Sequence, residues 1–207
     1  MKRLLLITFL SIGAISVSAQ SRFGARAGVN YSSIKIDYVD PNVQIDHKSA
    51  VSFQLGAYTE FSLFPQFFVQ PGLELTGLSS KNGSDPDYAQ NNLMFIKVPL
   101  NFGVRLPVGI GAVSLGTGPY FAYALSGKSK LNGQETDLNF GNDLSDSFKS
   151  TDFGLNFFGT YGMKSGLNFT LGYQLGLSDN APKAVTDQIS AKNRGMSFSI
   201  GYAIKLP

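Results

Sequence analysis

The last twelve residues of the chain, 196–207, alternate between large apolar side chains and small or polar ones. Because side chains alternate across a β-strand with period two, this pattern predicts a strand with one apolar and one polar face. The same alternation recurs along the chain, and no window of a dozen residues carries a helical apolar stripe. It predicts further strands at about 23–36, 51–63, 67–79, 92–106, 112–126, 151–163 and 167–177.

The connections between these eight segments alternate in length. The short ones lie at 64–66, 107–111 and 164–166. The long ones, rich in Asn, Asp, Ser and Lys, lie at 37–50, 80–91, 127–150 and 178–194. Outer-membrane barrels combine an even number of antiparallel strands with short periplasmic turns and longer external loops. The sequence therefore predicts an all-β fold: an eight-stranded antiparallel up-and-down transmembrane β-barrel with short periplasmic turns and long external loops.

The first nineteen residues have the features of a cleaved secretion signal. Lys2 and Arg3 precede an uncharged, mostly apolar run at 4–17, and small residues precede Gln20. An uncleaved anchor is the alternative, but a spanning helix needs about 20 apolar residues. We expect a signal peptide at 1–19 and one barrel domain at 20–207. The chain has no cysteine, so we expect no lipid-anchored lipoprotein, disulfide or thiolate metal site.

The charge of the chain gives no support for nucleic-acid binding. Removing Lys2 and Arg3 from 17 basic residues leaves fifteen, against fourteen acidic ones, so the mature chain is close to neutral. No cluster of Lys and Arg forms a basic face. No glycine-rich phosphate cradle follows a strand and opens a helix, so nucleotide binding has no support either.

The polar strand face is rich in Gly, Ala and Ser, which suits the narrow interior of an eight-stranded barrel. In a soluble, lipocalin-like barrel the apolar face would point inward instead. We expect the apolar face to meet lipid and the polar face to fill the barrel. Buried charges need partners, so we expect internal ion pairs, with Lys205 meeting Glu60 or Glu74; a proton or ion path is the alternative. The charged residues on this face are Arg26, Glu60, Glu74, Lys97, Arg105 and Lys205.

Aromatic residues near the strand ends are candidates for interfacial girdles on the lipid-facing surface. Some of them could instead be ordinary lipid-facing side chains. They are Tyr31, Phe61, Phe95, Tyr123, Tyr161 and Tyr202.

Five segments carry a resemblance to a known family. They are GARAGVNYS at 24–32, FFVQPGLEL at 67–75, IKVPL at 96–100, GTGPY at 116–120 and NRGMSFSIGY at 193–202. In this order they resemble the PorT-like outer-membrane barrels, or outer membrane protein beta-barrel domain. The resemblance implies an eight-stranded barrel in the outer membrane, usually without assigned biochemistry and with no catalytic residues to transfer. A few relatives are linked to protein secretion, but no motif here marks that role.

Candidate chemistry is sparse. His47 is the only histidine, and Asp46 and Ser49 are near it, so a lipid-modifying Ser–His enzyme is one alternative. These residues are neighbours in a loop, whereas catalytic triads depend on fixed geometry. The possible Ca²⁺ ligands Asp85, Asp87, Asp143, Asp146 and Asp152 have spacings that fit no known loop. We therefore predict no catalytic, cofactor-binding or metal residues.

The leading hypothesis is a non-enzymatic integral outer-membrane barrel whose external loops, especially 127–150, contact a ligand or partner. We expect outer-membrane lipid as a partner, with an envelope or secretion protein as a further candidate. The alternatives are a lipid-modifying barrel enzyme, a component associated with secretion across the outer membrane, and a soluble secreted barrel.

Overall fold

A computed structural model of the chain describes residues 21–38, 47–82, 89–131, 133–141, 143, 147–181 and 189–206. The expected signal peptide at 1–19 lies outside these residues. Every ladder between neighbouring strands is antiparallel. The strands are β1 (Arg22–Tyr38), β2 (His47–Ser62), β3 (Phe67–Asn82), β4 (Ala89–Val108), β5 (Gly111–Leu131), β6 (Gln134–Asp137), β7 (Thr151–Met163), β8 (Leu167–Gly176) and β9 (Ile189–Lys205).

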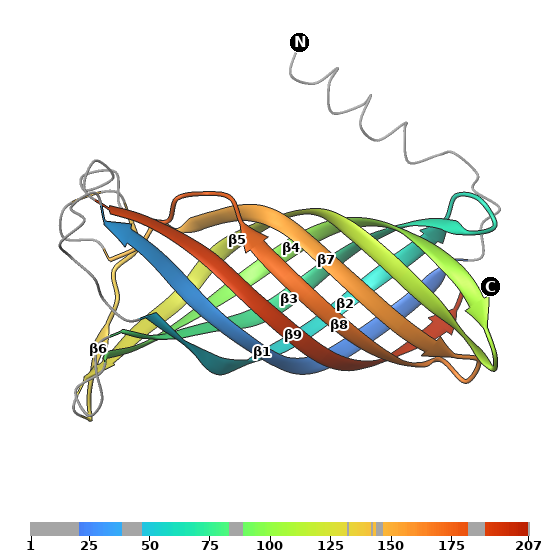
Figure 1. The fold of residues 1–207 in the computed structure, drawn as a ribbon, viewed down its shortest axis with the longest axis horizontal. Coiled ribbons are helices and arrows are strands. Elements are labelled where there is room, and N and C mark those ends of the chain that lie inside the picture. The colour runs from blue at the N-terminus through green and yellow to red at the C-terminus, as the bar shows by residue number, and fades with distance from the viewer. Residues whose placement is uncertain are drawn as a thin grey trace, which may run out of the picture.

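Eight of these strands close into a barrel (Figure 1). Each pairs with its neighbours in chain order, and β1 pairs with β9 over their whole lengths, from Arg22 opposite Lys205 to Tyr38 opposite Ile189. The short β6 pairs only with β5 and extends it as a hairpin. Closure leaves no open sheet edge in the wall, as a barrel surrounded by lipid requires. The predicted eight-stranded antiparallel barrel is confirmed.

The short connections gather at one end of the barrel, here called the turn end, and the strand ends that the long connections join lie at the other, the loop end (Figure 1). Gly109 and Gly166 have φ values of 56° and 100°, which glycine adopts without steric cost in a tight turn. At 63–66, Leu63 N–H donates to the Phe67 carbonyl over 2.9 Å. All three predicted short turns are present.

The strands extend further toward the loop end than the sequence indicated. β4 begins at residue 89, β5 continues to 131 and β9 begins at 189, inside segments expected to be loops. These extensions are polar, so apolar alternation could not reveal them. Their backbones nevertheless stay in register, with Gln90 opposite Lys130. The expected loop at 127–150 therefore contains a β-hairpin, and His47 lies at the start of β2.

The apolar strand face points outward, as predicted. Val51, Leu171 and Met196 are 65%, 66% and 63% exposed, whereas Glu74 on the opposite face is 2% exposed. A soluble barrel would bury the first set and expose the second. Within the described part of the chain, no helix is long and apolar enough to cross a membrane.

Aromatic side chains inside the barrel lie over glycines of neighbouring strands. A Cβ atom on Gly24 would come within 2.4 Å of the Tyr58 ring, and one on Gly116 equally close to the Phe158 ring. Any larger residue at these glycines would collide with the ring. The many glycines of the polar face thus leave room for large interior side chains.

Candidate functional site

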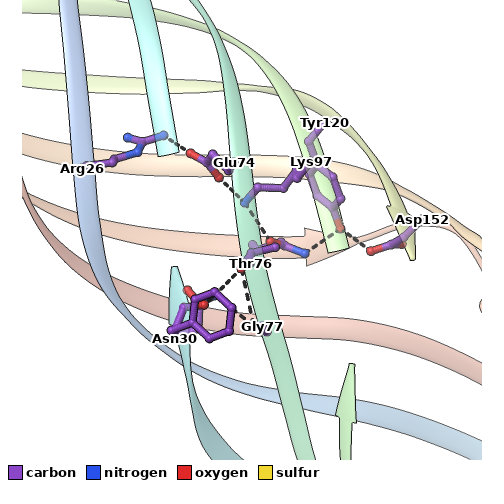
Figure 2. A network of polar contacts seen from close by, with 10 residues as sticks. Arg26, Asn30, Glu74, Thr76, Gly77, Lys97, Tyr120 and Asp152 are labelled. Carbon is purple, nitrogen blue, oxygen red and sulfur yellow. Dashed lines mark hydrogen bonds and ion pairs between the residues drawn. The ribbon is translucent and has the colours of Figure 1, made fainter. Parts of the chain in front are cut away.

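A buried charge network occupies the middle of the barrel (Figure 2). The Arg26 guanidinium donates to Glu74 Oε1, and Lys97 Nζ lies 2.8 Å from Glu74 Oε2. The side chains of Arg26, Glu74 and Lys97 are 9%, 2% and 6% exposed. One carboxylate thus neutralises part of the charge of two cations, an arrangement that buried charges require.

The register of the strands places these three residues in one row. Lys97 on β4 lies opposite Glu74 on β3, Glu74 lies opposite Gly56 on β2, and Gly56 lies opposite Arg26 on β1. A Cβ atom on Gly56 would come within 2.7 Å of Glu74 Cγ. The missing side chain at Gly56 is therefore what lets Arg26 reach across β2 to Glu74.

A second ion pair lies closer to the turn end. Arg105 on β4 binds the Glu60 carboxylate on β2 with both terminal nitrogens, and its Nη2–Oε2 contact measures 2.5 Å. Glu60 is 2% exposed, and the Arg105 guanidinium lies 5.3 Å from the centre of the Phe68 ring. A bidentate pair of this kind fixes the carboxylate geometrically.

A chain of hydrogen bonds links the central network to the opposite wall. Lys97 Nζ donates to Gln174 Oε1 over 3.2 Å, and Gln174 Nε2 donates to the Tyr120 hydroxyl over 3.0 Å. Tyr120 in turn donates to Asp152 Oδ2 over 2.9 Å (Figure 2). The polar contacts therefore cross the lumen from β3 to β7.

Asp152 connects the barrel to the long connection after β8. Its carboxylate is 2% exposed and accepts bonds from Ser178 (2.6 Å), Asn193 (2.9 Å) and Asn180 (3.3 Å) as well as Tyr120. Asp152 is thus surrounded by neutral donors. Ser178 and Asn180 belong to the loop-end segment, which these bonds hold against the lumen.

Asp179 lies outside the membrane-spanning strands and holds segment 177–181 in place. Its Oδ1 atom accepts backbone N–H bonds from Ala181 (3.0 Å) and Ala191 (2.9 Å). Partial burial alone would raise the pKa of Asp179, but these two backbone bonds, a side-chain bond from Ser190 and the positive charge of Lys149 together lower the pKa below its usual value. Asp179 therefore stays ionised and keeps the segment attached to β9 at neutral pH.

An apolar cluster fills the lumen at the loop end. Phe148, 8% exposed, comes from the connection before β7, and its backbone bridges that of Phe140. Leu138 and Phe140 pack against the buried cluster to which Phe148 belongs. The buried members of the cluster are Ile34, Leu78, Leu93, Phe95, Tyr120, Ala122, Ala124, Phe148, Ala181 and Ala191.

Two cavities of about 50 Å³ each lie along the lumen. Arg26 and Thr170 border both, so they lie between them. At about 15 Å³ for each water centre, each cavity has room for about three waters. Buried polar atoms without a protein partner, Arg26 Nε and Asn101 Oδ1 in one and Gln70 Oε1 in the other, can bind such waters.

Two residue assignments from the sequence are wrong. Lys205 is exposed near the turn end and makes no ion pair with the glutamates among the described contacts, because Arg105 occupies Glu60 while Arg26 and Lys97 occupy Glu74. Phe95 is 4% exposed and lies inside, because it shares the strand face of Lys97 rather than that of Ile96. The other proposed girdle residues lie on the outer face; Tyr31, Tyr123 and Tyr202 are at least half exposed.

The other candidate residues do not form a described site. His47 pairs with Asn82 in the β2–β3 ladder, and its side chain lies outside the described residues, as does Asp46. Among the proposed Ca²⁺ ligands, Asp152 is inside the barrel, Asp143 lies in the connection before β7, and Asp85, Asp87 and Asp146 lie outside the description. Within the described ranges, no group of three or more Asp, Glu, His or Cys residues is placed to hold a metal.

Sequence reasoning missed Tyr120, Gln174 and the Phe140–Phe148 seal. The period-two alternation places Tyr120 and Gln174 on the polar strand face, so the sequence held a signal for both residues. Two phenylalanines in a mostly polar loop were a second signal, but their meeting depends on a backbone bridge that has no sequence pattern.

Comparison with known proteins places the fold. Residues 18–181 match the outer membrane protein beta-barrel domain family, and the chain belongs to this family. It is therefore an integral β-barrel protein of the outer membrane. No curated protein matches the chain significantly.

Several solved outer-membrane barrels are similar in structure. OprG from Pseudomonas aeruginosa is 12% identical; the match covers 91% of this chain and 98% of OprG, with a TM-score of 0.50. Neisserial surface protein A is 10% identical, with 87% and 96% covered and a TM-score of 0.48. Ail, the attachment invasion locus protein of Yersinia pestis, is 12% identical, with 89% and 99% covered and a TM-score of 0.45. At 12% identity the likeness to OprG shows the fold alone.

The central network generates a stability prediction. Glu74→Gln leaves Arg26 and Lys97 buried without a counter-charge, so we expect it to lower the free energy of unfolding by about 3–5 kcal/mol. The matched control is Glu135→Gln, which breaks the exposed Lys128–Glu135 pair and should cost less than about 1 kcal/mol. Urea titration in detergent micelles, followed by circular dichroism, measures both. Equal losses would contradict the assigned role of Glu74.

Proposed function

We propose that the protein is a non-enzymatic outer-membrane barrel that presents its loop end to a ligand or partner outside the cell. The observation that carries the proposal is the filled lumen. Two ion-pair layers, a hydrogen-bond chain and an apolar seal occupy it. A barrel filled in this way has no wide pore, so its working surface lies at an end rather than inside.

The length of the strands supports the loop end as that surface. β4 has 20 residues and β5 has 21, whereas about 9–11 tilted residues cross the hydrocarbon core. The excess lies at the loop end, where β5 and β6 form a hairpin whose strand β6 is exposed throughout. At the same end, segments 147–150 and 177–181 are joined by a bond from the Lys149 N–H to the Asn180 carbonyl, and Asp152 binds Ser178 and Asn180. The loop end is thus an ordered platform over much of its described part.

The alternatives have less support. A PorT-like placement and a role in secretion remain predictions, since no described residue marks either. The lipid-modifying Ser–His alternative depends on His47, whose side chain lies outside the described residues, so it remains a prediction. Orientation follows the general rule that short turns face the periplasm and longer loops face outward.

The filled lumen predicts a closed barrel. In a planar lipid bilayer the full chain should give no conductance steps of the size of a sixteen-stranded porin, which serves as the positive control. The double variant Phe140→Ala/Phe148→Ala removes only the loop-end seal and should also stay closed, because both ion-pair layers remain. Porin-sized steps from the unaltered chain would contradict the proposal.

Orientation can be tested with two matched insertions. Gly133 at the tip of the β5–β6 hairpin and Gly109 at a turn-end tip both have positive φ, and a Cβ atom added to either glycine would meet no other atom within 4 Å. A cleavage site inserted after Gly133 should be cut by external protease on intact cells, and one after Gly109 only after lysis. The natural segments 127–150 and 64–66 should behave in the same way. The reverse pattern would invert the topology.

Contact of the loop end with a partner predicts that photo-crosslinking differs between the loop end and the turn end. A photo-crosslinking residue at Thr136, exposed on β6, should give a discrete adduct in intact cells. The same residue at Phe64, 67% exposed in a turn, should not give that adduct. Adducts of equal size and yield from both positions would argue against a loop-end partner.

A further inference from the structure

The outer wall carries a groove of about 360 Å³ near the loop end, crossing from β2 to β6. It lies where the β2–β3 ladder is interrupted between Ser49 and Gln54. There Ser52 Oγ donates to the Gly77 carbonyl over 2.7 Å. Asn30 Nδ2 donates to the same carbonyl over 3.1 Å (Figure 2). The Gly77 carbonyl, which lies in the interrupted part of the ladder, is therefore hydrogen-bonded by side chains inside the barrel. On the outside, small residues such as Ser79 leave a hollow in the wall.

The groove has an apolar and a basic part. Val51, Phe53 and Met94 line it on the side of the apolar belt. Lys128 and Lys130 line it on the side of the loops. Between them, Ser79 Oγ donates to Asn92 Oδ1 over 2.8 Å. The groove thus spans the level at which lipid-facing side chains change from apolar to polar.

A β-bulge directs the two lysines outward. Met94 pairs with Ser126 but Phe95 pairs with Ala124, so Leu125 is an extra residue in β5. Leu125 and Ser126 are both exposed, and the alternation of faces shifts by one residue beyond them. Because a bulge re-aims the side chains that follow it, Lys128 and Lys130 lie on the outer face. In an unbroken strand they would point into the lumen.

The described residues that line the groove carry a net positive charge, since Lys128 and Lys130 line it together with one carboxylate, Glu135. Glu135 lies 3.4 Å from Lys128 and opposite Lys130 in the ladder, and Asp137 lies opposite Lys128. All four side chains are exposed. The two lysines are therefore accessible to an anionic group in the groove.

We propose that this groove binds the phosphorylated head group of an outer-leaflet glycolipid of the lipid A type. Lys128 and Lys130 contact the phosphate, Ser79 and Asn92 face the sugar, and an acyl chain follows Val51, Phe53 and Met94. Only an amphiphile with an anionic head matches both parts of the groove, since basic residues beside a membrane attract anionic lipid head groups. The proposal rests on the proposed orientation, which puts this rim in the outer leaflet.

Binding of diphosphoryl lipid A to the full chain in mixed detergent micelles tests the site. The double variant Lys128→Gln/Lys130→Gln should bind at least tenfold more weakly. The matched control is Lys164→Gln/Lys205→Gln, which removes the same charge from exposed turn-end positions and should bind like the unaltered chain. Dephosphorylated lipid A should bind weakly to all three proteins. Circular dichroism verifies that each variant is folded.

Three results would overturn the proposal. These are unchanged binding by the Lys128/Lys130 variant, an equal loss in the control, and equally effective competition by phosphatidylglycerol. In micelles the lipid reaches both ends of the barrel, so this measurement does not depend on topology. Failure of the lipid site is therefore distinguishable from a reversed orientation, which the protease insertions detect.

Discussion

The structure depends on the need to pair every backbone N–H and C=O group that faces lipid. The ladders between β1 and β9 and between β4 and β5 meet this need by closing the sheet. Closure of eight strands leaves a lumen only wide enough for side chains. Everything inside must then fit that width, which explains why interior rings lie over glycines and why charges pair rather than line a channel.

Closure also separates two kinds of stabilisation. The outward-facing side chains are apolar and contact lipid. Side chains of the protein therefore pack against one another mainly inside the barrel, where most of them are polar. There the buried residues form layers: the Arg105–Glu60 pair, the Arg26–Glu74–Lys97 row, the Asp152 contacts and the apolar cluster around Phe148. The layers join strands that are not neighbours in the sheet, and so brace the barrel across its lumen.

Much of this architecture could be predicted from sequence because period two is a local signal. The eight strands, the long and short connections and the inward charges follow from it. The exact ion pairs could not be predicted, since Glu74 and Arg26 meet only through the register of three strands. The assignment of Lys205 was wrong because the alternation of residues shows the strand face on which a side chain lies but not its position along the barrel axis. The extended ends of β4 and β5 were missed because a polar strand outside lipid has no apolar alternation to reveal it.

Gly56 has a consequence for how sequences of this family can change. Arg26 reaches Glu74 only across a position that has no side chain. Arg26 and Glu74 can exchange their charges without a steric clash only while position 56 has no side chain. A larger residue at position 56 would have to be accompanied by loss of the Arg26–Glu74 pair. Substitutions at these four sites should therefore be correlated among relatives, with the uncharged glycine as one member of the correlated set.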